Sequence, residues 1–231
     1  MIPAAVFGAK GRMGRLIKGS SSQDVSIVQS FDKGDEPVLD PQVKVVIDFS
    51  LPDAWESLDS LLSTGTASLV SGTTGLHEKH REMLRKWSEK RPVFYSANMS
   101  IGIHVLKKLA LQARRMLGEG FDLELVEFHH DRKIDSPSGT ALSILEPFTG
   151  TRVHGRKGSA GPRDSREIGV HAVRGGDVAG EHRLYFLGQG ERLEISHSAG
   201  HRKIFAAGAV RAAKFIYKKN PGLYSMEDML G

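Results

Sequence analysis

The segment of residues 127–142, EFHHDRKIDSPSGTAL, concentrates the side chains best suited to acid–base chemistry. Lys133 follows the pair His129 and His130 within a few residues, and the SPSGT run at 136–140 is typical of a helix start with a Ser cap and Pro in the first position. Backbone amides at a helix start bind carboxylates. A dicarboxylate substrate that gains a hydride and then a proton would use this set, with Lys133 as the proton donor and His129 as an acid or electrostatic stabiliser.

A metal site is a weaker interpretation of the same segment. Successive side chains of a strand face opposite ways, so His129 and His130 cannot both bind one ion unless the strand has already turned. No His-x-x-x-His spacing lies nearby, and we expect no metal. The plainer alternative is a solvated polar loop before an ordinary capped helix. The remaining histidines are interpreted as surface or structural residues: His77, His80, His104, His154, His171, His182, His197 and His201.

A glycine-rich turn, GAKGRMG at residues 8–14, follows the first apolar run and opens a helix-like stretch. Glycines in this context let the backbone approach a pyrophosphate, whose charge is bound by the free amides of the helix start. The Gly-x-x-Gly-x-x-Gly spacing differs from the commoner Gly-x-Gly-x-x-Gly, so a turn without a ligand is the alternative. The turn residues expected at the cofactor are Gly8, Ala9, Lys10, Gly11, Arg12 and Met13.

The second apolar run ends at Asp32, about 20 residues beyond the turn, where a carboxylate can accept hydrogen bonds from the adenosine ribose. The adjacent Lys33, with Lys10 and Arg12 in the turn, could instead neutralise a ribose 2′-phosphate. Asp32 favours NADH and the cations favour NADPH, so we expect both to bind. A surface turn residue before Gly34 is the alternative for Asp32.

Two further turns follow the fourth and fifth strand-like runs, GTTG at 72–75 and SANMS at 96–100. In a parallel sheet they would share the carboxyl edge with the glycine turn, where ligands of such folds bind. The residues expected at the cofactor there are Gly72, Thr73, Thr74, Ser96, Ala97, Asn98 and Met99.

The first hundred residues must build that edge. Strand-like runs at 2–7, 25–31, 43–49, 67–70 and 93–95 alternate with helix-like stretches at 12–18, 52–62 and 76–90. This alternation predicts an α/β fold with a Rossmann-like parallel sheet covered on both faces.

The pattern changes after residue 100 and predicts a second, α+β domain with a mostly antiparallel or mixed sheet. A helix over 101–117 precedes strands at 123–128, 168–173, 182–187 and 193–197, the last two joined as a hairpin. Residues 150–166 are a Gly- and Arg-rich stretch in which 155–164 are expected to form a mobile surface loop, and 204–217 are expected to form an amphipathic helix.

Composition limits the possible chemistry. The 231-residue chain has no cysteine, which excludes disulfides, thiolate nucleophiles and iron–sulfur clusters. Its net charge of +5 is spread over mixed helix-like stretches, so no nucleic-acid partner is expected. No apolar run approaches the roughly 18 residues of a membrane helix, and the first residues do not resemble a signal peptide. We therefore expect a cytoplasmic protein with no membrane partner.

Taken together, the motifs resemble those of the dihydrodipicolinate reductases, the 4-hydroxy-tetrahydrodipicolinate reductase family of bacterial lysine and diaminopimelate synthesis. The resemblance covers essentially the whole chain, and the E-x-H-H-x-x-K-x-D-x-P-S-G-T-A arrangement is its most specific part. The segments that carry it are GAKGRMG, GTTG, SANMSIG, EFHHDRKIDSPSGTAL, RGGDVAGEH at 174–182 and GERLEISHSAGHRKIFAAGAVRAA at 190–213.

This resemblance implies roles for particular residues. His129 and Lys133 would be catalytic, and His130, Gly139 and Thr140, with Ser138 at the same helix start, would bind substrate. The glycine turn, the acidic residue after the second strand, and the GTT and SANM segments would contact NADPH or NADH.

The resemblance also implies an organisation. Residues 1–100 and 205–231 would form the dinucleotide-binding domain and residues 101–204 a substrate-binding and oligomerisation domain, in a homotetramer. One departure is visible: the helix expected from Pro137 stops early, at Pro147, and the linker after it is short for the family, which affects the edge of the second domain. Another NAD(P)-dependent amino-acid dehydrogenase of this architecture and a cofactor-sensing binding protein remain alternatives.

Overall fold

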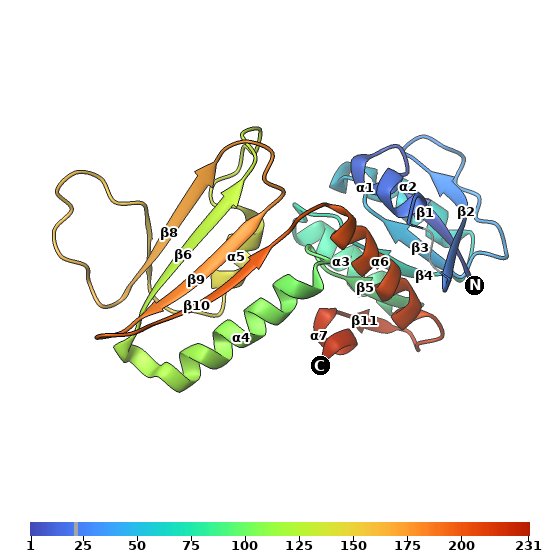
Figure 1. Ribbon diagram of the computed structural model, residues 1–231. Helices are drawn as coiled ribbons and strands as arrows, with labels where there is room; N and C mark the ends of the chain where they lie inside the picture. Colours follow the sequence, from blue (N-terminus) through green and yellow to red (C-terminus); the bar gives the residue numbers. More distant parts are fainter. Residues whose placement is uncertain (21–22) are drawn as a thin grey trace. The chain divides into compact units, whose positions relative to one another are not determined.

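The structure is a computed structural model that describes residues 1–20 and 23–231. Its internal contacts divide the chain into two units. Unit 1 comprises Met1–Ser100 and Arg202–Gly231, and unit 2 comprises Ile101–His201. Each unit has its own sheet and its own helices (Figure 1).

Unit 1 is built on a six-stranded parallel sheet in the order β11-β5-β4-β3-β1-β2. Its strands are β1 (Ile2–Phe7), β2 (Val25–Phe31), β3 (Val45–Asp48), β4 (Ser68–Ser71), β5 (Pro92–Tyr95) and β11 (Gly222–Tyr224). Its helices are α1 (Arg12–Lys18), α2 (Trp55–Ser63) after the 3-10 turn η1 (Pro52–Ala54), α3 (Glu78–Ser88), α6 (Lys203–Ile216) and α7 (Met226–Leu230). The predicted Rossmann-like sheet is confirmed.

The sequence of the central strands explains their position. Every residue of β3 and β4 is buried, as expected for strands covered on both faces. Helix α2 places Leu58 and Leu61 in the core at 0 % exposure. The ring of Trp55 packs on Trp87 of α3 with centroids 5.1 Å apart, and both rings belong to the same core cluster. Burial of this apolar surface holds the helices on the sheet.

Unit 2 contains a five-stranded mixed sheet in the order β10-β9-β6-β8-β7. Its strands are β6 (Asp122–His129), β7 (Thr151–His154), β8 (Glu167–Arg174), β9 (Glu181–Leu187) and β10 (Arg192–Ser198). Its helices are α4 (Ile101–Leu117), followed by the 3-10 turn η2 (Gly118–Gly120), and α5 (Gly139–Leu145). The predicted hairpin of the last two strands is confirmed. Strand β6 lies between β8 and β9 and pairs in parallel with β8 and antiparallel with β9, so the sheet is mixed.

Strand β6 sets the two faces of this sheet. Its residues alternate strictly between half-buried and buried, with Leu123, Leu125, Glu127 and His129 on the buried side. The two leucines join a core cluster with residues of α4 and α5, so the helices cover this face. The alternation therefore carries Glu127 and His129 onto the helix-covered face of the sheet.

Two strands and one helix start differ from the sequence-based prediction. Strands β7 and β11 were not predicted. Both are short edge strands that are held by backbone pairing and lack a buried alternating pattern. Helix α5 begins at Gly139 rather than at Pro137, because Ser138 and not Ser136 caps it: the Ser138 hydroxyl accepts a hydrogen bond from Ala141 N at 3.1 Å. In the described residues, no helix is both long and apolar enough to cross a membrane.

Candidate active site

The carboxyl ends of the unit 1 strands bring the predicted nucleotide-binding turns to one edge of the sheet. The glycine turn follows β1, Asp32 follows β2, GTTG follows β4 and SANM follows β5, and all four strands are parallel. The order of the sheet reverses between β1 and β3, which is where such folds bind their ligands. The predicted cofactor residues thus lie on the edge that suits a dinucleotide.

The glycine turn itself is tightly packed. Gly8 has φ +80°, in the left-handed region that favours glycine. A Cβ on Gly14 would lie 2.2 Å from the carbonyl oxygen of Gly8, so no larger residue fits there. These two glycines are therefore required by the turn itself. Lys10, Gly11 and Arg12 are the exposed residues of the turn.

Asp32 is tied to this turn. Its Oδ2 accepts a hydrogen bond from the backbone amide of Lys10 at 2.9 Å, and its own amide donates to Asp35 Oδ2 at 2.7 Å. The carboxylate is thus fixed beside the glycine turn, and the exposed Lys33 follows it. This arrangement offers both an acceptor for ribose hydroxyls and a cation for a phosphate.

A second guanidinium lies near the turn, and the sequence did not indicate it. Burial, together with the positive charge of Arg12, lowers the pKa of Arg202 at the start of α6. Two neighbouring cations favour an anionic ligand at this position. The two residues are separated by 190 positions, so only the return of α6 to unit 1 brings them together.

The GTTG and SANM turns contribute mainly through their backbone. The Thr73 hydroxyl donates to the buried carboxylate of Asp48 at 2.8 Å, and Ser71 donates to the same oxygen at 2.7 Å. Met99 is 1 % exposed and packs within the unit 1 core. The side chains of Thr73 and Met99 therefore stabilise the fold and are not available to a ligand. Thr74 and Ala97 are exposed at the carboxyl edge of the sheet.

In unit 2, the predicted chemical residues follow β6 directly. Backbone bonds from the segment after β8 hold the end of this strand: His130 N donates to Val178 O at 2.8 Å, and Gly175 N donates to His129 O at 3.0 Å. The Lys133 ammonium then donates to both oxygens of Asp135, at 2.7 and 2.9 Å.

The same Asp135 carboxylate also reaches the start of α5. Its Oδ2 accepts a long hydrogen bond, 3.4 Å, from the Gly139 amide. Burial acts to raise the pKa of Asp135, but the hydrogen bond and charge of Lys133 outweigh it, and the pKa lies below its usual value. A carboxylate is thus already bound by the cation and the amide that we expected to bind a substrate carboxylate.

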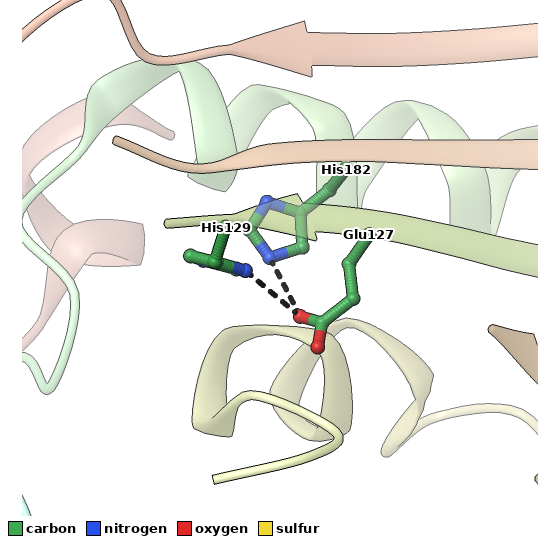
Figure 2. A group of neighbouring side chains, drawn as sticks. All are labelled: Glu127, His129 and His182. Carbon is green, nitrogen blue, oxygen red and sulfur yellow. Dashed lines mark ion pairs between the residues drawn. The ribbon is translucent and has the colours of Figure 1, made fainter. Parts of the chain in front are cut away.

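Behind this loop lies a buried cluster that the sequence did not predict (Figure 2). Glu127 is 0 % exposed, and its Oε1 accepts hydrogen bonds from Ser138 N at 2.9 Å and Arg174 Nη2 at 2.8 Å. Its Oε2 lies 3.5 Å from His129 Nδ1 and 3.6 Å from His182 Nε2. One oxygen of the Glu127 carboxylate therefore faces the start of α5, and the other oxygen faces the two imidazole rings.

Burial controls the charges of this cluster. It lowers the pKa of His129 to about 4, with Lys133 and Arg174 acting in the same direction and Glu127 opposing them. It also lowers the pKa of His182 to about 4. Burial would raise the pKa of Glu127, but the hydrogen bonds from Ser138 and Arg174 lower it overall. Near pH 7 the cluster consists of an ionised carboxylate and two neutral imidazoles.

Glu127, His129 and His182 are close enough to one another to be considered as a metal site. Their ligand atoms lie within 4.8 Å of one another, close enough for one ion to bridge. However, Arg174 already pairs with the Glu127 carboxylate, and Lys133 is near enough for its charge to act on both histidines. Two positive charges at this short range oppose a cation. We therefore interpret the cluster as a carboxylate–imidazole network and not as a metal site.

Comparison with known proteins decides the family. Residues 2–99 match the model of the dihydrodipicolinate reductase N-terminus, and residues 102–230 match that of its C-terminus. The chain belongs to the dihydrodipicolinate reductase family. The resemblance seen in the sequence motifs is confirmed, and the family is one of nicotinamide-dependent oxidoreductases.

Individual relatives agree with this assignment. A 4-hydroxy-tetrahydrodipicolinate reductase from Sulfurimonas denitrificans is 40% identical over 254 residues, covering 100% of this chain and 99% of the relative. One from Akkermansia muciniphila is 40% identical over 243 residues, covering 100% and 98%. Among solved structures, a dipicolinate-bound dihydrodipicolinate reductase from Paenisporosarcina sp. TG-14 has a TM-score of 0.76, with 21% identity and both chains fully covered, which supports the fold.

Three residues of the buried cluster were not predicted from the sequence: Glu127, Arg174 and His182. A signal for the first was present, because Glu127 precedes His129 by two positions on a strand and must share its face. Arg174 and His182 lie in the RGGDVAGEH segment that contributed to the resemblance, but no spacing along the chain indicated that they meet Glu127.

The depressed histidine pKa values predict a loss of stability in mild acid. Above about pH 6.5 both histidines are neutral in the folded and the unfolded chain. As the pH falls from 6.5 towards 4, the unfolded chain binds protons that the folded chain does not, so the free energy of unfolding decreases. The largest decrease in the free energy of unfolding is about 3 kcal/mol for each histidine.

Thermal unfolding midpoints measured between pH 7 and pH 4 check this prediction. The double variant His129→Gln/His182→Gln should show a flatter dependence on pH. His171→Gln, which removes a histidine paired with Glu124 at 2.8 Å, serves as the matched control and should keep the wild-type slope. An equal slope in all three proteins would contradict the assignment.

Proposed function

We propose that this chain reduces 4-hydroxy-tetrahydrodipicolinate to tetrahydrodipicolinate with a nicotinamide cofactor, in bacterial lysine and diaminopimelate synthesis. The observation that carries the proposal is the loop after β6. In this loop the Asp135 carboxylate accepts hydrogen bonds from both the Lys133 ammonium and the Gly139 amide, and Lys133 is near enough to His129 for its charge to act there. A small dicarboxylate would replace the contacts that Asp135 now makes.

The residue roles follow from this chemistry. The hydroxyl group of the substrate leaves as water together with a proton from the neighbouring carbon, which creates a carbon–carbon double bond in the ring. A nicotinamide cofactor would supply the hydride that reduces this bond. Lys133 donates a proton to the carbon next to the one that accepts the hydride, and its charge attracts a carboxylate. His129, neutral near pH 7, acts by accepting or donating a proton at one ring nitrogen. His130 and the helix start at Gly139 and Thr140 bind the substrate carboxylates. Ser138 was predicted to join them, but it is 1 % exposed and its amide is bound to Glu127 Oε1, so it supports the helix start instead.

A coupled assay tests the proposal. The product of the aldol step, made in place by a synthase, is supplied to the purified chain with NADPH or NADH, and the loss of reduced-cofactor absorbance is followed. We expect turnover that depends on the synthase product. An amino-acid dehydrogenase of similar fold would oxidise an amino acid instead, and a cofactor-sensing protein would bind NADPH without turnover.

Both reduced cofactors are expected to bind. We propose that the glycine turn, Asp32 and Lys33, with the GTT and SANM segments, contact the cofactor, a proposal supported by their common sheet edge. Asp32 would accept hydrogen bonds from the ribose hydroxyls of NADH. Lys33 and Arg12 would contact the 2′-phosphate of NADPH.

Replacing Lys33 by Ala should separate the two cofactors. An exposed lysine–phosphate contact is worth on the order of 1 kcal/mol, so the KM for NADPH should rise roughly 5- to 10-fold while that for NADH stays within about a factor of two. Steady-state kinetics with each cofactor measure this. Lys18→Ala, which removes an exposed lysine at the end of α1, is the control. An equal rise for both cofactors would contradict the assignment of Lys33.

The organisation is proposed on the same basis. We assign residues 1–100 and 205–231 to the dinucleotide-binding domain and 101–204 to the substrate-binding and oligomerisation domain of a cytoplasmic homotetramer. The face of the unit 2 sheet opposite its helices is the candidate for assembly, since Val173 and Leu187 on it are 42% and 37% exposed. Light scattering coupled to size-exclusion chromatography tests the tetramer, and cell fractionation tests the location.

A further inference from the structure

The carboxylate of Glu127 is the feature of this molecule that the proposed roles leave unexplained. It is completely buried, and within the described residues its Oε2 has no hydrogen-bond partner. An unsatisfied buried carboxylate oxygen is costly, so its position calls for a function. The atoms it faces are His129 Nδ1 and His182 Nε2, at 3.5 and 3.6 Å (Figure 2).

The other oxygen fixes how this carboxylate is oriented. Oε1 accepts hydrogen bonds from the Ser138 amide at the start of α5 and from the Arg174 guanidinium at the end of β8. Two donors on one oxygen keep the group ionised and prevent it from rotating. Glu127 thereby connects the helix start expected to bind substrate with the ring of His129.

The surroundings of His129 determine which of its nitrogens carries the proton. Nδ1 is buried, and among the described residues the acceptor it faces is Oε2 of Glu127 on its own strand. A proton on Nδ1 can be donated to Oε2, whereas a bare Nδ1 would place a lone pair against a negative oxygen. Nε2 is then the nitrogen with the free lone pair. A Cβ on Gly180 would lie 3.1 Å from Nε2, so the glycine keeps that side open.

His182 competes for the same oxygen. Its Nε2 lies 3.3 Å from the Ser138 hydroxyl and 3.6 Å from Oε2, and its Nδ1 is buried without a hydrogen-bond partner among the described residues. A buried N–H without an acceptor costs more than a bare nitrogen, which assigns the proton to Nε2. The two rings, with centroids 5.2 Å apart, therefore both direct an N–H towards Glu127.

We propose that Glu127 is a positioning residue that keeps the proton of His129 on Nδ1 and so presents Nε2 as a proton acceptor to the substrate, with His182 as a second donor that limits how strongly Glu127 holds His129. The presentation to substrate rests on the proposed function of His129. The titratable and charged groups that face His129 are Glu127 on its strand, His182 on β9, Arg174 on β8, and Lys133 and Asp135 in the loop.

Glu127→Gln is the variant that tests this. The amide oxygen of Gln must face Ser138 N and Arg174, because an NH2 group there would meet two donors. Its NH2 group then faces His129 Nδ1 and donates to it, which moves the ring proton to Nε2. We expect kcat to fall roughly 10- to 100-fold, with the KM for NADPH unchanged within about a factor of two.

Glu124→Gln is the matched control. It removes a carboxylate from the same strand that also pairs with a histidine, His171, at 2.8 Å, but on the other face of the sheet. This variant should keep the kcat of the wild type. Glu127→Asp, which keeps the charge but shortens its reach, should recover part of the lost activity.

NMR of the histidine ring nitrogens in the free chain reports which nitrogen carries the proton. A purely structural role of Glu127 would not change that tautomer. In the wild type, ring nitrogen shifts should show His129 protonated on Nδ1. In Glu127→Gln they should show Nε2–H, and the pKa of His129 should fall further because the carboxylate that favours the charged form is gone. These spectra need no substrate, so they test the inference even if the coupled assay fails.

The outcomes separate the two proposals. A wild-type enzyme that turns over, with an unchanged tautomer and near-normal kcat in Glu127→Gln, overturns the role of Glu127 and leaves the proposed function intact. If Glu127→Gln does not fold, His182→Leu replaces it: Oε2 then serves His129 alone, and the pKa of His129 must rise. An unchanged pKa in that variant overturns the inference.

Discussion

Replacing Lys133 by Met should lower kcat by about 10²–10⁴ while leaving the affinity for NADPH nearly unchanged. Methionine keeps the length of the side chain but removes the ammonium, and with it both the proton donor and the charge that binds a carboxylate. The ammonium now donates to Asp135 at 2.7 and 2.9 Å, so it is already held by a carboxylate in the place expected for substrate. The predicted cofactor residues lie in unit 1, which explains the unchanged cofactor affinity.

The measurement is steady-state kinetics in the coupled assay, together with NADPH binding by fluorescence. Arg132→Met is the matched control, because it removes a neighbouring positive charge whose side chain is 75% exposed and paired with Asp131. The control should retain wild-type turnover. Near-normal kcat in Lys133→Met would rule out Lys133 as the acid, and a large loss of NADPH binding would point to a different role.

Replacing His129 by Gln is expected to lower kcat by about 10²–10³. Gln has a similar length and keeps one hydrogen-bonding group near Glu127, but it cannot exchange a proton at a ring nitrogen. The pKa of His129, lowered to about 4, keeps the ring neutral, so the wild-type enzyme should be most active above that pH and lose activity as the ring becomes charged. This acidic limb of the pH profile should disappear in the variant.

The pH dependence of kcat/KM in wild type and variant measures this effect. His171→Gln is the control, since His171 is likewise paired with a glutamate in unit 2 but lies on the opposite face of the sheet. The double variant with Lys133→Met should lose less than the product of the two single effects if both groups act in one proton transfer. Full multiplicativity would indicate that they act independently.

Parts of this fold were predictable because their signals are local. A buried strand such as Val45–Asp48 can be predicted from its run of apolar residues. The 17-residue helix α4 can be predicted from the helical periodicity of its apolar residues. The glycine turn was predictable because Gly8 and Gly14 meet a steric requirement of the turn itself. Strand β7 was not predictable, because its four residues are mostly exposed and show no alternation of buried and exposed side chains.

The start of α5 shows where a local rule has two solutions. Ser136 before Pro137 and Ser138 before Gly139 both satisfy the pattern of a helix cap, and the first was predicted. The structure has the second, because the Ser138 amide is bound by Glu127 and its hydroxyl by Ala141 N. Which serine caps the helix depends on the Glu127 carboxylate of strand β6, and sequence rules for helix starts do not include contacts with a strand.

The sequence by itself determined the family, the Rossmann-like sheet, and a loop in which Lys133 follows His129, because these are encoded in residues close to one another along the chain. Only the tertiary structure decided the electrostatics of the site. It brought Arg174 and His182, 47 and 55 positions after Glu127, to one buried carboxylate, and it enclosed His129 so that its pKa falls to about 4. The pKa of a side chain depends on its burial and on the charges around it, and these depend on how strands from different parts of the chain pair. That pairing cannot be predicted from the residue spacing within any one segment.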